Sequence, residues 1–363
     1  MRVGVAAWIG STNLGDELVY ASLRAKLTER GAEAVALSVA PEATLRDHGA
    51  DAARRSRAVV GGLSGLDALV LGGGGLLQDE TSIANLPYHL SPLAVAAARR
   101  TPAAGVGLGA GPLRRRSSRR LVRAALRDLD VTVRDSPSAR VLGDLGVRSA
   151  VGADLAFGLP ARDTAPRDAI ALCLRTWGGG GGRLPVGWHR ASSPEWFVAA
   201  AASAVDQLVD ATGLTVRLIA FDPVRDASLL HSVVARSRHG AEVVLPTLET
   251  VLDEVASARV VVAMRYHAAV AAALAGRPAV LVGYSPKVAA LAAELGHGAT
   301  LVPWSAEGMA SLALLVPEVI ERGDAVREAC DRLRVAERVN GLALDRLLER
   351  AQPAARRRSP TPG

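Results

Sequence analysis

The amino-acid sequence predicts an α/β protein with two Rossmann-like domains that face one another across a cleft. Short runs rich in Ala, Val and Leu alternate with longer helical patterns, and glycines often stand where the apolar runs end. This alternation is typical of a parallel, doubly wound sheet. The pattern stops at residues 159–168, which are rich in proline and charged residues, and then starts again. A chain of 363 residues is long enough to form two such cores.

We therefore expect an N-terminal domain over residues 1–160 and a C-terminal domain over residues 168–350. In the first domain the predicted helices are residues 18–30, 92–100 and 119–129, and the predicted strands are 3–9, 33–39, 68–74, 103–111, 131–135 and 149–155. In the second domain a long helix at 194–213 accompanies predicted strands at 169–177, 215–221, 241–246, 259–264, 278–284 and 299–303. Helices broken near Pro317 and Gly323 should follow, and the Pro- and Arg-rich tail, residues 351–363, should be disordered.

The composition argues against a nucleic-acid partner. The net charge is +7, but the segment 114–120 holds five arginines and the segment 356–358 three more, so the rest of the chain carries −1. Aromatic residues make up only 3%, too few for platforms that stack on bases.

The sequence also lacks the marks of export, membrane insertion and metal binding. It has no run of about 18 apolar residues, and its first segment has the pattern of a strand rather than of a signal peptide. Cys173 and Cys330 match no metal or redox spacing, which is typical of buried thiols in a cytosolic protein.

Polar residues follow the predicted strands, where parallel sheets bind their ligands. The stretch "GSTNLGDE" places Asp16 and Glu17 at a helix start, where carboxylates are also ordinary caps. The stretch "GGGGLLQDE" begins at residue 72, and its glycines either bring the backbone close to a ligand or form a tight turn. Gln78 and Asp79 could bind hydroxyls or cap the next helix.

Cationic residues also follow strands. Arg134 precedes Asp135, which indicates either a structural ion pair or a forked anion ligand. Arg265 and His267 open an Ala-rich helix whose first N–H groups favour an anion, although a histidine there is often a core residue. Lys287 repeats this geometry after the next strand. Together these side chains indicate a small, strongly anionic ligand.

Five glycines at residues 178–182 interrupt the second domain after its first strand. No P-loop Lys-Ser/Thr pair follows them, so we expect a mobile loop at the edge of the cleft or a plain flexible linker.

In this order, the motifs resemble those of the polysaccharide pyruvyl transferase family, especially its bacterial members that act on secondary cell wall polysaccharide and anchor S-layers. The resemblance covers nearly the whole chain and lies in "GSTNLGDE", "GGGGLLQDETS", "GVGLGAGP", "TVRD", "GADLAF", "LRTW" and "RYHAAVAAALAGRPAVLVGYSPK". It implies a glycosyltransferase-B-like (GT-B-like) pair of domains. It also implies transfer of pyruvate from phosphoenolpyruvate (PEP) to two sugar hydroxyls as a cyclic ketal, with release of phosphate.

By position, the resemblance places the PEP-binding residues at Arg134, His267 and Lys287, and we add Arg265 beside them. PEP would be a co-substrate, and we expect neither a cofactor nor a metal ion. Tyr266 departs from the Leu that the family often has, and "YSPK" departs from Tyr-Asp-Pro-Lys. The stretch "TSIANLPYH" departs from a serine-containing segment ahead of paired tyrosines, which leaves the acceptor sugar open.

Ketal formation needs a base for a sugar hydroxyl and an acid for C3 of PEP. We assign His267 as the proton donor or the phosphate partner, because its pKa lies near neutrality. Asp16 or Glu17 would enter from the opposite domain as the base. The sugar would be bound by Asn13, Gly73, Gly74, Gln78 and Asp79.

The arginine-rich segment Arg114–Arg127 predicts a basic amphipathic helix. One face carries arginines at 116, 119, 120, 123 and 127, and the other carries Leu121, Val122, Ala125, Leu126 and Leu129. Such a helix is either an ordinary solvated surface or a contact with anionic lipid or a lipid-linked diphosphate acceptor. The second case would place a cytoplasmic enzyme at the inner face of the membrane.

Two other functions suit the same architecture, since a fold alone does not fix function. A nucleotide-sugar-dependent GT-B glycosyltransferase would need an acidic residue for the ribose in the second domain, and the sequence offers no convincing one. A non-catalytic sugar- or phosphate-binding protein would bind PEP without releasing phosphate.

Overall fold

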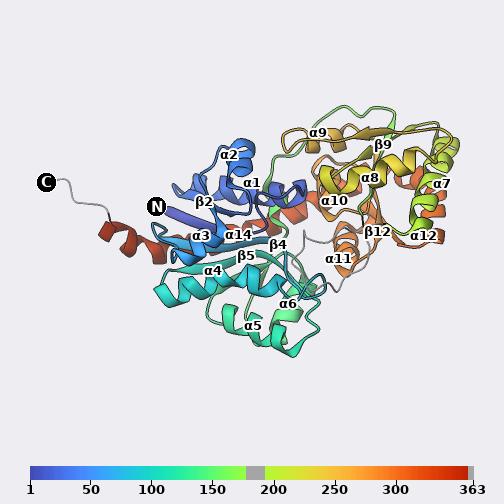
Figure 1. Cartoon of the computed structure of the whole chain (residues 1–363). Helices are drawn as coiled ribbons and strands as arrows, with labels where there is room; N and C mark the ends of the chain where they lie inside the picture. The colour runs from blue at the N-terminus through green and yellow to red at the C-terminus, as the bar shows by residue number, and fades with distance from the viewer. Residues whose placement is uncertain (177–192, 359–363) are drawn as a thin grey trace.

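Two parallel sheets form the core of the protein, and this confirms the predicted fold class (Figure 1). The structure is a computed structural model that describes residues 1–176 and 193–358. The expected glycine loop at 178–182 lies outside the described residues. Within them, no helix is both long enough and apolar enough to cross a membrane.

The first sheet has seven strands in the order β3-β2-β1-β4-β5-β6-β7. In chain order they are β1 (Arg2–Ala6), β2 (Glu33–Ser38), β3 (Ala52–Arg54), β4 (Ala68–Leu77), β5 (Ala103–Ala110), β6 (Asp130–Val133) and β7 (Ala150–Val151). Its helices are α1 (Leu14–Glu29), α2 (Pro41–His48), α3 (Arg55–Val60), α4 (Asn85–Arg99), α5 (Arg116–Leu126), α6 (Ser136–Gly143) and the 3-10 turn η1 (Leu155–Gly158).

The second sheet has six strands in the order β10-β9-β8-β11-β12-β13. They are β8 (Ala169–Cys173), β9 (Thr215–Ile219), β10 (Glu242–Val244), β11 (Val260–Ala263), β12 (Ala279–Gly283) and β13 (Ala299–Pro303). The helices are α7 (Glu195–Thr212), α8 (Pro223–Val234), α9 (Val251–Ala256), α10 (Tyr266–Leu274), α11 (Pro286–Leu295), α12 (Ala306–Ala310), α13 (Leu312–Val319) and α14 (Gly323–Arg358), with the 3-10 turn η2 (Gly296–Gly298).

Every predicted strand overlaps an observed one, whereas the short elements β3, α2, α3 and α6 were not predicted. Pro317 was expected to break a helix but lies inside α13. The helical region is interrupted at Ser311, between α12 and α13, and again just before Gly323, where a break was expected. Both cysteines are buried and form no disulfide, as expected.

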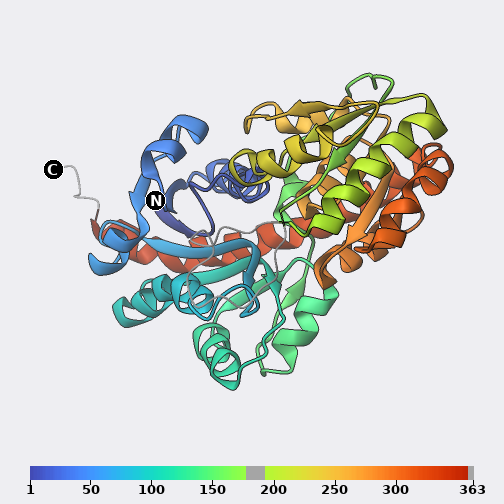
Figure 2. The ribbon, with the colours of Figure 1, turned by 45° about the vertical axis from the view of Figure 1, so that its right-hand side comes forward.

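The last helix, α14, joins the two halves of the molecule. It starts beside the second sheet and runs along the first, as the red helix in Figures 1 and 2 shows. Lys26 of α1 pairs with the buried Glu337 of α14 at 2.7 Å, and Arg30 pairs with Asp345 at 2.7 Å. The helix continues to Arg358, so the expectation of disorder from residue 351 was wrong for residues 351–358.

Asn340 fixes α14 to the end of the first sheet. Its side chain is fully buried, accepts from Thr132 Oγ1 at 2.6 Å and donates to the carbonyl of Ala153 at 3.0 Å. Thr132 in turn accepts from the amide of Gly107. The chain of hydrogen bonds therefore links α14, β6 and β5.

We expect Asn340→Ala to lower the free energy of unfolding by about 1–3 kcal/mol, because it leaves the buried Thr132 hydroxyl and Ala153 carbonyl without a hydrogen-bond partner. Urea unfolding followed by circular dichroism measures this loss. The matched control is Arg338→Ala, an exposed position on the same helix that should change stability by less than about 0.5 kcal/mol. Equal effects of the two substitutions would contradict the role of Asn340.

Candidate active site

The carboxyl ends of the two sheets face each other around a cavity of about 620 Å³. Its walls come from segments at the ends of β1, β4, β5 and β6 in the first domain and of β8, β9, β11 and β12 in the second. Both sheets reverse their strand order here, at β1/β4 and at β8/β11, and this is where open α/β sheets bind ligands.

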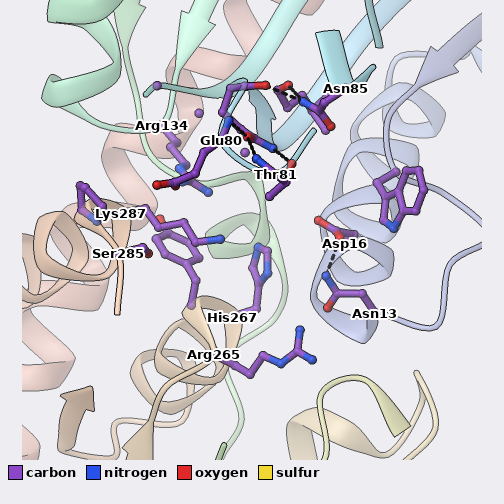
Figure 3. Close-up of a pocket in the computed structure, with 18 of the residues that line it drawn as sticks. Asn13, Asp16, Glu80, Thr81, Asn85, Arg134, Arg265, His267, Ser285 and Lys287 are labelled. Carbon is purple, nitrogen blue, oxygen red and sulfur yellow. Dashed lines mark hydrogen bonds between the residues drawn. The ribbon is translucent and has the colours of Figure 1, made fainter. Parts of the chain in front are cut away.

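Asp16 enters the cavity from the first turn of α1. Asn13 caps this helix by accepting from the amide of Gly15, and its amide group donates to Asp16 at 2.5 Å. Burial raises the pKa of Asp16, although the nearby His267 and Lys287 partly offset the effect. Figure 3 shows Asp16 and Asn13 on one side of the cavity and Lys287 on the other, with His267 between them. Asp16 therefore suits the role of a base.

Glu17 does not reach the cavity, so its assignment as an alternative base was wrong. It is buried, accepts from the amide of Ser11 at 2.9 Å and pairs with His48 at 2.8 Å. Consecutive residues of a helix point about 100° apart, so only one of the two acids can face the cleft. Glu17 stabilises the loop before α1 instead.

The glycine tract lies within β4 rather than in a tight turn. Gly73 has φ of +53° and a Cβ there would lie 2.0 Å from Val19, so it lets α1 pack against β4. Neither Gly73 nor Gly74 lines the cavity, whereas Gly75 does. The assignment of Gly73 and Gly74 to the acceptor sugar was therefore wrong.

Two polar residues after β4 support the local backbone. Asp79 is buried and accepts from the amides of Arg114 and Arg115, both at 2.9 Å, so it holds the start of α5 and does not line the cavity. Gln78 does line it, but its side chain accepts from the amides of Glu80 and Thr81 and donates to the Thr81 hydroxyl. The assignment of Asp79 to the acceptor sugar was thus wrong, and the assignment of Gln78 stays a prediction.

Arg134 follows β6 and is buried at the cavity wall. Its Nε donates to Asp135 at 3.2 Å, and Nη1 lies 3.6 Å from Asp154. The guanidinium also lies over the ring of Tyr266, 4.3 Å from the centroid. Arg134 is therefore both a structural ion-pair partner and a cation presented to the cavity.

His267 lies in the first turn of α10 and is 8% exposed. Its Nε2 is 3.6 Å from Asp154, too long for a hydrogen bond. Burial would raise the pKa of Asp154, but His267 and Arg134 outweigh burial and lower it. Within the described residues Nε2 of His267 has no hydrogen-bond partner.

Lys287 and Tyr284 belong to the segment between β12 and the first turn of α11, and both line the cavity. Burial lowers the pKa of Lys287. The ammonium of Lys287 lies 5.9 Å from the centroid of the Tyr284 ring, and Nη1 of Arg175 donates to the Tyr284 hydroxyl at 2.6 Å. Tyr284 and Arg175 were not predicted as site residues.

Arg265 lines the cavity, but its guanidinium is committed to Asp226. Nε and Nη2 donate to this fully buried carboxylate at 2.9 Å and 2.6 Å. This bidentate pair fixes the start of α10, for which Arg265 is the N-cap residue. Binding of PEP by Arg265, which lines the cavity, stays a prediction.

Residues 13–286 match the family model described as polysaccharide pyruvyl transferase. The chain belongs to this family. The polysaccharide pyruvyl transferases are enzymes, and the family implies a polysaccharide acceptor. No curated protein sequence matches the chain significantly.

Several solved structures resemble this chain in fold. The UDP-GlcNAc 2-epimerase of Neisseria meningitidis has 11% identity and a TM-score of 0.59 over 95% of this chain and all of its own. S. aureus MnaA, solved with UDP, has 11% identity and a TM-score of 0.64 over 100% of this chain and 99% of its own. Anabaena HepE with UDP has 14% identity and a TM-score of 0.57 over 98% and 100%. At these identities the similarity shows the fold alone, a GT-B pair of Rossmann-like domains.

The cavity thus collects most of the predicted set, namely Asn13, Asp16, Gln78, Arg134, Arg265, His267 and Lys287. The sequence analysis missed Asp154, Arg175 and Tyr284, although each lies in a motif quoted for the resemblance. The position of Arg175 and Tyr284 just after strands was a signal that could have identified them.

As pH is raised, one tyrosine per chain, Tyr284, should lose its proton with a midpoint near pH 7. Burial would raise the pKa of Tyr284, but Arg175, Lys287 and Arg265 outweigh burial and lower it to about 7. Burial raises the pKa of Tyr20 to about 12 and also raises those of Tyr88 and Tyr266, so only Tyr284 loses its proton as pH rises through neutrality. Near-ultraviolet difference absorbance measures the step.

Tyr284→Phe should abolish this step, and Tyr88→Phe is the matched control that should leave it unchanged. Arg175→Gln should move the midpoint upward, because it removes the cation bonded to the phenol oxygen. A first tyrosinate step near pH 10 in the wild type would contradict the prediction.

Proposed function

We propose that this protein transfers the pyruvyl group of PEP to two hydroxyls of a sugar in a cell-surface polysaccharide or its lipid-linked precursor. The products would be a cyclic pyruvate ketal and phosphate. One observation carries the proposal: Asp16 from one domain and His267 and Lys287 from the other line the same cavity, and the last two lower the pKa of Asp16. The family membership of the chain supports the same reaction.

The second domain and the end of β6 would bind the donor. PEP carries a phosphate and a carboxylate on the same enol carbon, so it needs several fixed cations within a small volume. Arg134 and Lys287 would bind these two anionic groups. Arg134 is well suited because Asp135, Asp154 and Tyr266 already hold its guanidinium in one orientation, which lowers the entropy lost on binding.

The reaction needs two steps whose proton transfers balance. In the first, His267 gives a proton to C3 of PEP, one sugar oxygen attacks C2, and Asp16 takes the proton of that hydroxyl. In the second, the C2–O bond to phosphate breaks, the second sugar oxygen attacks C2, and its proton leaves with the phosphate. Asp16 then returns its proton through solvent to His267. The scheme uses PEP as a co-substrate and calls on no cofactor or metal ion.

The local environment supports these assignments. Burial raises the pKa of Asp16, which makes its carboxylate a stronger base. Burial raises the pKa of Asp154 less than His267 and Arg134 lower it, so this carboxylate stays ionised 3.6 Å from Nε2 of His267. His267 can therefore serve both as the acid and as a partner of the departing phosphate.

The finer parts of the proposal concern the acceptor. Similarity of the motifs to S-layer-anchoring members favours a sugar of a secondary cell wall polysaccharide. The basic face of α5 favours a lipid-linked form made by a cytoplasmic enzyme at the inner face of the membrane. In α5 only Ser118, Val122 and Leu126 are buried, and Leu121, expected on the packed face, is 37% exposed beside the arginines.

PEP should bind the wild type, and Lys287→Ala should weaken this binding at least about tenfold. A charge-assisted contact contributes about 1.5–3 kcal/mol, and about 1.4 kcal/mol corresponds to a factor of ten. Titration calorimetry measures the affinity, and the exposed Arg46→Ala is the control for a lost positive charge outside the cavity. Binding of UDP-glucose without binding of PEP would favour the nucleotide-sugar glycosyltransferase instead.

Sedimentation with vesicles of phosphatidylglycerol and phosphatidylcholine tests the membrane contact. The triple variant Arg119→Ala, Arg120→Ala, Arg123→Ala should bind these vesicles at least about tenfold more weakly than the wild type, because each arginine near an anionic surface contributes to binding. A triple variant of equal charge, with Ala at the exposed positions Arg46, Arg332 and Arg338, is the control. Unchanged vesicle binding by the α5 variant would remove the membrane contact from the proposal.

A further inference from the structure

The end of the cavity formed by β1 and α4 has a different chemistry from the end proposed for PEP. Gly73, Gly74 and Asp79 do not line it. Its walls are instead built mainly from an aromatic ring, an imidazole and neutral polar groups, contributed by Trp8, Thr81, Asn85 and His89. Glu80 also lines the cavity, and its carboxylate pairs with Arg114 at 2.9 Å. An apolar surface with a few fixed hydrogen-bonding groups is the usual composition of a site for a neutral ligand.

Trp8 lies two residues after the end of β1 and is partly exposed at the cavity wall. Two rings from α4 hold it in place: Tyr88 lies 5.8 Å away at 69° and His89 lies 6.0 Å away at 67°. Tyr88 and His89 also contact each other edge to face at 5.1 Å. The indole is therefore a rigid aromatic surface, which loses little entropy when a ligand binds.

His89 is a neutral hydrogen-bond donor with a fixed tautomer. It is 3% exposed, and burial together with Arg55 lowers its pKa well below the usual value. Nη1 of Arg55 lies 3.4 Å from Nδ1 of His89. Because a guanidinium only donates, Nδ1 must accept and the proton resides on Nε2.

Arg55 is itself held by the sheet, so the tautomer of His89 does not depend on solvent. The buried guanidinium donates to the carbonyls of Ala7 and Leu37, and it lies 4.5 Å from the centroid of the Tyr88 ring. Ala7 is the residue directly before Trp8, so the arginine connects the backbone of β1 to the imidazole. Arg55 thus holds both the backbone next to Trp8 and the imidazole of His89 in place.

We propose that Trp8 and His89 form the binding platform for the acceptor sugar. A pyranose ring would stack its apolar C–H face on the indole, and Nε2 of His89 would donate to one of its hydroxyls. Two vicinal or 1,3-related hydroxyls on the far edge of the ring would then face Asp16, which lies on the helix that follows Trp8. This inference rests on the proposed function, in which the cationic end of the same cavity holds PEP.

The two ends of the cavity explain why donor and acceptor do not compete. An anion at the Trp8 end would face a neutral imidazole rather than a fixed cation, and a sugar at the Lys287 end would leave buried cations without a counter-charge. The cavity therefore sorts the two substrates by charge.

Saturation-transfer NMR with saturating PEP tests the platform, and its probes are the methyl pyranosides of glucose, galactose, mannose, N-acetylglucosamine and N-acetylmannosamine. At least one probe should bind the wild type, and Trp8→Ala should weaken that probe about tenfold, whereas Trp8→Phe, which keeps an aromatic face, should stay within about threefold. His89→Phe should weaken the probe, and His89→Gln, which keeps an N–H donor, should retain it. The control is Trp196→Ala, a partly exposed tryptophan of the other domain, which should change nothing.

Calorimetry with PEP on the same variants separates this inference from the proposed function. PEP affinity should be equal in the wild type and in all Trp8 and His89 variants. The platform is overturned if PEP binds but none of the five sugars does, or if Trp8→Ala leaves sugar binding unchanged. Absence of PEP binding in the wild type would instead overturn the proposed function, and sugar binding measured without PEP would then still decide on the platform.

Discussion

The geometry of the site depends on one contact, between Gly15 in the first turn of α1 and the imidazole of His267 in the first turn of α10. A Cβ on Gly15 would lie 2.2 Å from Nδ1 of His267, so any other residue here would displace the ring. The contact lets two helix starts, one from each domain, meet at the cavity wall. The amide of Leu14 donates to the carbonyl of Phe221 at 2.8 Å, and Thr12 donates to Asp222 at 2.6 Å, which fixes the same approach. Asp16 reaches the cations of the second domain because Gly15 has no side chain.

The charges around this contact are stable only as a set. Asp154 lies between Arg134 and His267, and each of the three is at least nine-tenths buried. Removing one partner would leave a buried charge uncompensated, at a cost of about 3–5 kcal/mol. These contacts bring a buried carboxylate close to both cationic side chains, and burial lowers the pKa of the nearby Lys287. Tyr284 and Asp16 partly offset this effect of burial, and a bound anion would add further counter-charge beside the ammonium.

The sequence was sufficient to predict residues whose position follows from the strand order. It was not sufficient for residues whose role depends on a partner far away in the chain. The carboxyl ends of parallel strands meet at one edge, so Arg134, His267 and Lys287 could be brought together from the strand pattern without any distance. The role of Glu17 could not be derived, because its partner His48 lies 31 residues away on α2, a helix that was not predicted. The same holds for Arg265, whose partner Asp226 lies 39 residues away. Buried ion pairs of this kind depend on packing that composition and periodicity do not encode.

The relation between the two domains is as much a part of the site as its side chains. Asp16 and the platform residues come from the first domain, and His267 and Lys287 from the second, so a small rotation would separate the base from the acid. Helix α14 opposes such a rotation, because it starts under the second sheet and is bonded to the first through Glu337 and Asn340. Misplacing reacting groups by about 1 Å can cost about a hundredfold in rate. A helix that lines no part of the cavity therefore contributes to its chemistry, by holding the two halves of the site at a fixed separation.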